Sequence, residues 1–270
     1  MSATSVRSAA TVLDAARAEG RAALVGYLPV GFPDVATSVD AVVAMVEGGC
    51  DVIEVGVPYS DPVMDGPTIQ QAAEVAVRGG TTLTDAFNAV RAVADAGGAA
   101  LVMSYWNPVL RLGVDRFATE LAAAGGSGAI TPDLIPDEAG DWLAASDAHG
   151  LDRVFLVAPS STDARIASTA AASRGFVYAA SAMGVTGTRA SIGHAASDLV
   201  ARVRALAPGI GVCVGLGVSD GDQAAEVAAY ADGVIVGSAF VRRMLDDPGP
   251  GGVAAVRTLA AELAEGVRRR

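Results

Sequence analysis

Short apolar runs rich in β-branched residues alternate with longer alanine-rich stretches of helical spacing along almost the whole sequence. Eight apolar runs predict strands, near residues 22–28, 52–57, 99–104, 128–130, 154–157, 176–180, 211–215 and 233–236. The stretches between them predict helices, among them 34–47, 82–96, 137–149, 163–174, 191–206 and 219–229, with a last helix near 252–267. Several of these helices begin with Asp or Ser, which cap helix N-termini. Eight strand–helix units predict an α/β fold, a (β/α)8 TIM barrel, with a doubly wound open sheet as the alternative.

The chain shows no sign of a division into domains. No linker, low-complexity segment or change of composition interrupts residues 1–270, so we expect a single TIM-barrel domain. The first twenty residues are rich in Ser, Ala and Arg, a composition that would also suit a transit peptide. However, acidic residues occur among them, and Val12, Leu13 and Ala16 repeat at helical spacing. An extra N-terminal helix is therefore the favoured interpretation.

Charge, hydropathy and cysteine usage argue against several classes of function. The net charge is −11 and basic residues cluster only at the C-terminus, so nucleic acid is not an expected partner. No apolar run reaches the roughly 18 residues of a membrane span. Cys50 and Cys213 form no ligand cluster with His149 and His194, so we expect no metal and a reducing, cytoplasmic setting. A Ser-His-Asp triad stays open, although the sequence has no G-x-S-x-G elbow.

The sequence contains no lysine, and its nineteen basic residues are all arginine. Arginine stays protonated in proteins and cannot act as an amine nucleophile. The chain therefore cannot form a lysine Schiff base with a carbonyl substrate or with pyridoxal phosphate. Its chemistry must proceed by other means.

A stretch with three acidic residues and no basic one begins inside the second predicted strand: EVGVPYSDPVMDGPTIQ, residues 54–70. Because side chains alternate along a strand, Glu54 shares with Val52 and Gly56 the face that we expect to point into the barrel. Burial there would raise the pKa of Glu54 and suit it to general acid catalysis near neutral pH. The alternatives are a structural Glu54 satisfied by backbone donors and an Asp65 that serves only a turn.

Glycine-containing loops follow the last three predicted strands: GVTG (184–187), GLGVSD (215–220) and GSAF (237–240). Glycine lets backbone N–H groups approach a ligand closely. In barrels of this kind the loops after strands seven and eight, with a short helix N-terminus, recur as phosphate sites. Ordinary turns are the alternative. The phosphate-site candidates are Gly187, Gly217, Gly237 and Ser238.

The stretch at 54–70 resembles the signature of one family, the α subunits of tryptophan synthase. Further similar segments run along essentially the whole chain: GYLPVGFPD (26–34), MSYWNP (103–108), PDLIPDEA (132–139), GVTGTR (184–189), VGLGVSD (214–220) and DGVIVGSAFV (232–241). The resemblance implies a (β/α)8 barrel, in agreement with the pattern of elements. It also implies a carbon–carbon lyase that cleaves indole-3-glycerol phosphate to indole and glyceraldehyde 3-phosphate.

The resemblance also assigns roles to individual residues. The family's general acid–base glutamate corresponds to Glu54, and the aspartate that takes up charge at the indole N–H corresponds to Asp65. Substrate-binding positions correspond to Tyr27, Ile69, Met103, Tyr105, Ile130, Tyr178, Thr186, Leu216 and Ile235. Phosphate-binding positions correspond to Gly187, Gly217, Gly237 and Ser238. Tyr27 stands where many members of the family have Phe, and Thr186 matches a threonine that closes over the catalytic aspartate.

The same resemblance implies an explanation for the missing lysine. Aldol-type cleavage needs an electron sink, and indole protonated at C3 can serve as one. In this interpretation Glu54 delivers the proton, Asp65 balances the positive charge on the ring nitrogen, and ionised Glu54 then accepts the proton of the C3′ hydroxyl. The acidic residues lack basic partners because they serve a substrate that becomes transiently cationic.

The resemblance further implies a partner, a β subunit that carries pyridoxal phosphate, in an α2β2 tetramer. No cofactor is then expected in this chain. Asp61, Asn107 and Pro108 match positions near the family's subunit interface. The alternatives are a stand-alone lyase that releases free indole and an inactive activator of the β subunit. If the chain were an inactive activator, we would expect Glu54 or Asp65 to be replaced, and both residues are present.

Overall fold

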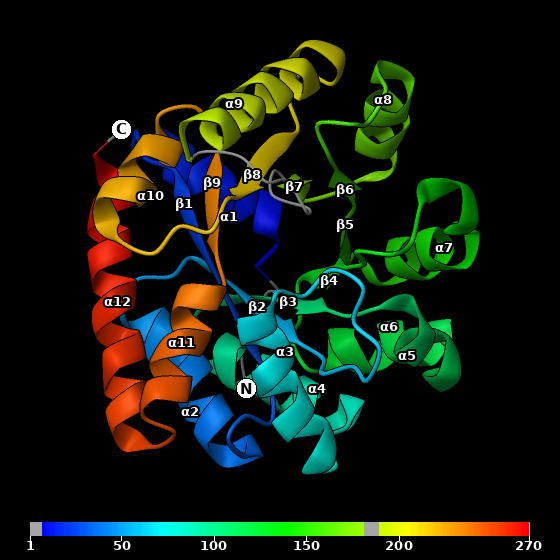
Figure 1. Cartoon of the computed structure of the whole chain (residues 1–270). Coiled ribbons are helices and arrows are strands. Elements are labelled where there is room, and N and C mark those ends of the chain that lie inside the picture. The colour runs from blue at the N-terminus through cyan, green and yellow to red at the C-terminus, as the bar shows by residue number, and fades with distance from the viewer. Residues whose placement is uncertain (1–6, 181–188, 270) are drawn as a thin grey trace.

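The computed structural model describes residues 7–180 and 189–269, and its described strands form one sheet (Figure 1). The strands are β1 (Ala23–Pro29), β2 (Val52–Gly56), β3 (Ala99–Met103), β4 (Gly128–Ile130), β5 (Asp152–Val154), β6 (Leu156–Val157), β7 (Phe176–Ala180), β8 (Gly211–Gly215) and β9 (Gly233–Val236). Every pairing between these strands is parallel, in the order β5-β4-β3-β2-β1-β9-β8-β7-β6.

The sheet closes on itself at Phe155. This residue separates β5, which pairs with β4, from β6, which pairs with β7. The two short strands are halves of the single strand predicted at 154–157, so the ends of the sheet meet there. The backbone N–H of Tyr178 donates to the carbonyl of Phe155 at 3.1 Å, across the junction. The prediction of a closed barrel is confirmed, and the open-sheet alternative is wrong because the sheet has no free ends at this point.

All of the helices except the first surround the ring of strands (Figure 1). The helices are α1 (Ala9–Ala18), α2 (Val35–Glu47), α3 (Pro67–Arg78), α4 (Leu83–Asp95), α5 (Trp106–Leu112), α6 (Val114–Ala123), the 3-10 turn η1 (Pro136–Glu138), α7 (Gly140–His149), α8 (Asp163–Ala172), α9 (Arg189–Leu206), α10 (Gly221–Ala228), α11 (Ser238–Asp246) and α12 (Pro250–Arg268). The predicted capping of α2 is confirmed, because the carboxylate of Asp34 accepts from the N–H of Thr37 at 2.8 Å. The helix predicted from residue 137 instead begins at Gly140, after η1. The sequence patterns did not predict α3, α5, α6 or α11.

The side chains of β2 alternate as predicted between the inside and the outside of the barrel. Val52 belongs to the inner apolar cluster, whereas Ile53 and Val55 belong to the cluster between the strands and the helices. Glu54 lies between those two outward-facing residues in the chain and therefore points inward. In the described part of the chain, no helix is both long and apolar enough to cross a membrane.

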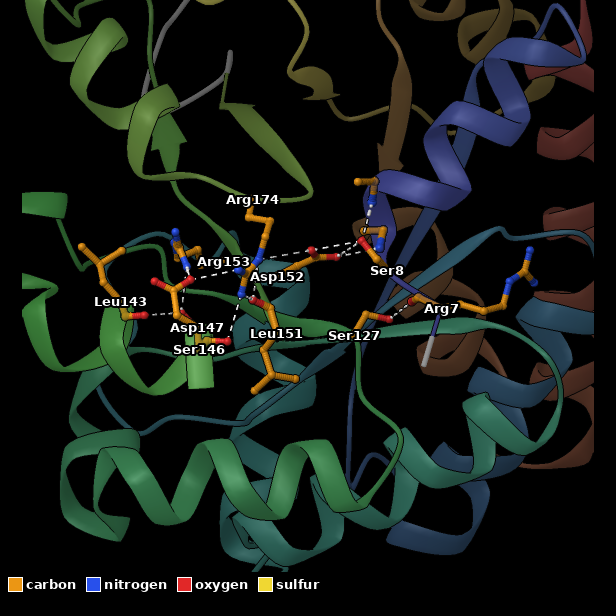
Figure 2. A network of polar contacts seen from close by, with 12 residues as sticks. Arg7, Ser8, Ser127, Leu143, Ser146, Asp147, Leu151, Asp152, Arg153 and Arg174 are labelled. Atoms are coloured by element: carbon orange, nitrogen blue, oxygen red, sulfur yellow. Dashed lines mark hydrogen bonds and ion pairs between the residues drawn. The ribbon is translucent and has the colours of Figure 1, made fainter. Parts of the chain in front are cut away.

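Helix α1 fills the N-terminal end of the barrel, which confirms the extra helix. Its buried face, formed by Ala9, Val12, Leu13 and Ala16, packs against the inward-facing side chains of the strands. Figure 2 shows how the helix start is fastened to the first residue of β5, Asp152. The Asp152 carboxylate accepts from the hydroxyl of Ser8 and from the N–H of Ala9, the latter at 2.7 Å.

Candidate active site

A cavity of about 460 Å³ opens at the C-terminal ends of the strands. Its walls come from the ends of several strands, from the connection between β2 and α3 and from the start of α11. Ten of the predicted site residues line it: Tyr27, Glu54, Asp65, Ile69, Met103, Tyr178, Gly217, Ile235, Gly237 and Ser238. Closure of the barrel thus brings together residues that are distant in the sequence, such as Tyr27 and Ser238, which are 211 positions apart (238 − 27).

Glu54 projects from β2 into this cavity and is 1% exposed. Among the described residues its Oε1 atom has no hydrogen-bond partner. Burial raises the pKa of Glu54 from 4.5 to about 8, because the charged form is poorly solvated there. The structural alternative, a glutamate satisfied by backbone donors, is therefore not supported at Oε1. The side chain holds a proton near neutral pH and can donate it to a ligand in the cavity.

Asp65 lies in the connection between β2 and α3 and is partly buried. Its backbone is fixed by the side-chain amide of Gln70, which donates to the Asp65 carbonyl at 2.8 Å. The hydroxyl of Tyr105 donates to its carboxylate at 3.5 Å. Burial raises the pKa of Asp65 and the hydrogen bond from Tyr105 partly opposes that rise. Asp65 therefore has more of the solvation that an ionised carboxylate needs than Glu54 does.

Two tyrosines flank the carboxyl groups, and each lies over a glycine. Tyr27 is the cross-strand neighbour of Glu54, and a Cβ atom at Gly56 would come within 2.5 Å of the Tyr27 hydroxyl. A Cβ atom at Gly215 would come within 2.6 Å of the Tyr178 hydroxyl. Burial raises the pKa of Tyr27, and the charges of Asp65 and Glu54 raise it further, so the hydroxyl stays protonated.

Three of the predicted phosphate residues, Gly217, Gly237 and Ser238, line the cavity. Ser238 is the first residue of α11 and Gly237 precedes it. The first N–H groups of a helix lack acceptors within the helix and favour an anion. Gly217 has φ +65° and open space where a side chain would lie, which leaves its backbone accessible. Gly187 and Thr186 lie outside the described residues.

Three predicted substrate residues do not line the cavity. Ile130 is fully buried in the inner cluster, and Leu216 packs against the outer cluster. Leu216 directly follows the last residue of β8, Gly215, so alternation along the strand does not determine where its side chain points. Tyr105 is buried, and its hydroxyl contacts the backbone of the loop that carries Asp65.

Sequence reasoning missed several lining residues, namely Met64, Gly66, Pro67, Thr68, Leu156, Ala180 and Gly215. Alternation from Val154 predicts that Leu156 faces inward, so that residue could have been found. The loop residues follow no such period, and only the folded loop places them.

The three residues predicted at a partner interface lie in two elements, Asp61 in the connection between β2 and α3, and Asn107 and Pro108 in α5. Asn107 donates to the hydroxyl of Tyr59 at 3.1 Å, and Asp61 accepts from Ser60 at 2.6 Å. Asn107 and Pro108 line a second depression of about 410 Å³ together with Tyr59. Within the described ranges, no group of three or more His, Cys, Asp or Glu side chains is placed to hold a metal ion.

Comparisons with known proteins all lead to one family. Residues 13–266 match the family model described as "Tryptophan synthase alpha chain". The alpha chain of tryptophan synthase from Thermobifida fusca is 67% identical over 256 residues, which cover 94% of this chain and 95% of the relative.

Solved structures agree with this result. A chain of Mycobacterium tuberculosis tryptophan synthase superposes with a TM-score of 0.90 and 62% identity, covering 96% of this chain and 98% of the other. A chain of the tryptophan synthase α2β2 complex of Pyrococcus furiosus superposes with a TM-score of 0.81 and 31% identity, covering 90% of this chain and 98% of the other.

Proposed function

The chain belongs to the tryptophan synthase alpha chain family, and on that premise we propose how its cavity cleaves indole-3-glycerol phosphate. The products are indole and glyceraldehyde 3-phosphate. The observation that carries the proposal is the buried Glu54, which lines the same cavity as Asp65 and whose Oε1 atom has no hydrogen-bond partner in the described part of the protein.

The cavity offers separate surroundings for the two ends of the substrate. Gly237 and Ser238, at the start of α11, and Gly217 bind the phosphate through backbone N–H groups and one hydroxyl. The apolar side chains of Met103 and Ile235 line the cavity together with Tyr178 and suit an indole ring. The glycerol carbons then lie between the ring and the phosphate, within reach of the carboxyl groups.

The first chemical step is protonation of the indole ring. Protonated Glu54 gives its proton to C3 of the ring, and the positive charge that results is shared with the ring nitrogen. Asp65, ionised, accepts the ring N–H and balances this charge. The pKa of about 8 that burial gives Glu54 keeps a large fraction of the acid form available near neutral pH.

The second step breaks the carbon–carbon bond. Glu54, now ionised and poorly solvated, takes the proton of the C3′ hydroxyl, on the glycerol carbon attached to the ring. The C–O bond becomes the aldehyde carbonyl, and the electron pair of the breaking C–C bond neutralises the ring to give indole. The substrate ring is the electron sink, so the absence of lysine from the sequence does not limit this reaction. The reaction requires no cofactor in this chain.

We further propose that the chain works with a β subunit in an α2β2 tetramer, where pyridoxal phosphate belongs to β. The similarity to the chain from the Pyrococcus furiosus α2β2 complex supports this arrangement. Asp61, Asn107 and Pro108 lie beside two exposed apolar side chains, Val63 at 82% and Leu110 at 53% exposure, which suit a protein interface. The two buried free cysteines fit a reducing compartment, and we assign the complex to the cytoplasm.

The direct test is release of indole and glyceraldehyde 3-phosphate from indole-3-glycerol phosphate by the full chain, with and without a β subunit. We expect both products in equal amounts, together with faster turnover when β is present. Turnover unaffected by β would favour a stand-alone lyase. No turnover in either case, with normal substrate binding, would leave only the role of an activator.

A further inference from the structure

Asp65 is carried by residues 57–66, a connection with few anchors. At its start the N–H of Val57 donates to the carbonyl of Met103 at 2.9 Å, and at its end Gly66 begins the hydrogen bonding of α3. The residues between are exposed or partly exposed, so apolar packing contributes little to their position. The conformation of the connection therefore depends on a small number of polar contacts.

The hydroxyl of Tyr105 makes three of those contacts. It accepts the backbone N–H of Val63 at 3.1 Å and that of Met64 at 2.9 Å. A phenolic hydroxyl accepts with its oxygen and donates one proton. With two donors on the oxygen, its proton points to the remaining acceptor, Oδ1 of Asp65, at 3.5 Å.

We propose that Tyr105 is a positioning residue of the lyase reaction. Its hydroxyl accepts two backbone N–H groups of the loop and donates its own proton to the carboxylate of Asp65. The inference rests on the proposed function, because it takes Asp65 as the group that balances charge on the ring. It differs from the expectation that Tyr105 binds substrate, since the hydroxyl is occupied by the protein itself and the residue does not line the cavity.

Tyr105 is suited to this role because it is itself firmly held. It follows β3 and is 6% exposed. Its carbonyl accepts from the hydroxyl of Ser104 at 2.8 Å, and the backbone N–H of the next residue, Trp106, donates to the carboxylate of Asp133 at 2.9 Å. The Tyr105 ring makes a further contact to the connection, because it packs against the ring of Tyr59 with 5.2 Å between centroids. Tyr105, held at the end of a barrel strand, thus fixes the position of a loop that has little packing of its own.

The contact also affects the charge of Asp65. Burial raises the pKa of Asp65, and the hydrogen bond from Tyr105 opposes that rise by stabilising the carboxylate. The proposed reaction needs Asp65 ionised and Glu54 protonated, so turnover should follow a bell-shaped pH profile. Asp65 sets the acid limb, and Glu54, with a pKa of about 8, sets the alkaline limb.

The test is Tyr105→Phe, which keeps the ring and its packing on Tyr59 and removes only the hydroxyl. We expect the turnover number to fall roughly 10-fold to 100-fold, the scale of one lost hydrogen bond to a charged group. The Michaelis constant for indole-3-glycerol phosphate should change much less. The acid limb of the pH profile should move to higher pH, because the pKa of Asp65 rises, while the alkaline limb stays in place.

A second measurement does not depend on activity. Amide hydrogen exchange at Val63 and Met64 should be faster in Tyr105→Phe, because both N–H groups lose their acceptor. Tyr230→Phe is the matched control: it removes a tyrosine hydroxyl near the start of β9, at the opposite end of the barrel, and that hydroxyl has no partner among the described residues. The control should reproduce the wild-type profile and exchange rates.

The outcomes separate this inference from the proposed function. A wild-type chain without lyase activity would overturn the proposed function whatever the exchange rates are. If the wild type is active and the acid limb of the pH profile lies at the same pH in Tyr105→Phe as in the wild type, the positioning role is overturned. A variant whose loss lies only in the Michaelis constant would overturn it as well, because that result assigns the hydroxyl to substrate binding.

Discussion

The two ends of the barrel each bury a carboxyl group, and the two groups have opposite surroundings. Glu54, near the C-terminal end of β2, and Asp152, the first residue of β5, are each 1% exposed. Asp152 accepts hydrogen bonds from Ser8 and Ala9 (Figure 2). Glu54 Oε1 accepts none from any residue that the structure describes. Burial raises the pKa of both groups, but only at Asp152 do hydrogen bonds oppose the rise.

This difference separates what stabilises the fold from what performs the reaction. The satisfied carboxyl fastens α1 across the N-terminal end of the barrel, where it contributes to stability. The unsatisfied one keeps its hydrogen-bonding capacity for a substrate at the C-terminal end, where barrels of this class have their active sites. An unpaired buried acid costs stability in the free protein, and four substitutions test this contrast.

The largest expected effect is on turnover. Glu54→Gln keeps the shape of the side chain and removes its acid, so turnover should fall by about 10²–10⁴-fold while the fold persists. Steady-state release of indole measures the loss, and circular dichroism checks the fold. A variant that is folded and nearly as active as the wild type would show that Glu54 is not the proton donor.

The same variant should be more stable than the wild type near neutral pH. The pKa of Glu54 is about 8 in the folded chain against a reference of 4.5. Between those values the unfolded chain has released a proton that the folded chain still holds, so wild-type stability falls as the pH rises. Glutamine has no such penalty, and its advantage should be on the order of 3 kcal/mol at about pH 7 and vanish below the reference pKa. Urea unfolding at several pH values measures this, and an advantage independent of pH would contradict it.

At the N-terminal end of the barrel we expect the opposite effects, a loss of stability with turnover unchanged. Asp152→Ala leaves the N–H of Ala9 buried without its acceptor and should lower the free energy of unfolding by about 2 kcal/mol. Turnover of the folded enzyme should stay near the wild-type value. Asp152→Asn, which retains one acceptor oxygen, is the control and should lose less. If Asp152→Ala were stable but inactive, the division between the two ends would be wrong.

The smallest expected effect belongs to Ser8→Ala. The hydroxyl of Ser8 caps α1 by accepting from the N–H of Ala10 at 3.2 Å, and it also donates to Asp152. Its removal should cost about 1 kcal/mol, because Ala9 still donates to Asp152. Thermal unfolding measures the loss. A larger loss than that of Asp152→Ala would mean that the cap, and not the carboxylate, fastens the helix.

Local periodicity explains which of these features the sequence could predict. Alternation placed Glu54 inside the barrel, whereas Leu216 follows the end of β8, where alternation no longer determines the direction of a side chain. The contact between Ser8 and Asp152 joins residues 144 positions apart, and only barrel closure brings them together. The hydroxyl of Tyr105 binds backbone N–H groups, whose direction depends on the loop conformation and not on the identity of Val63 or Met64.

The glycines beneath the two tyrosines have a consequence for how this cavity can change. A Cβ atom at Gly56 would collide with the Tyr27 hydroxyl, and one at Gly215 would collide with that of Tyr178. In each pair, a larger residue at the glycine position therefore requires a smaller residue at the tyrosine position. Libraries that randomise position 56 or 215 by itself should return glycine almost exclusively. Libraries that vary each pair together can exchange the large and the small side chain, which changes the shape of the cavity without overfilling it. Substitutions that reshape this cavity should therefore occur in pairs.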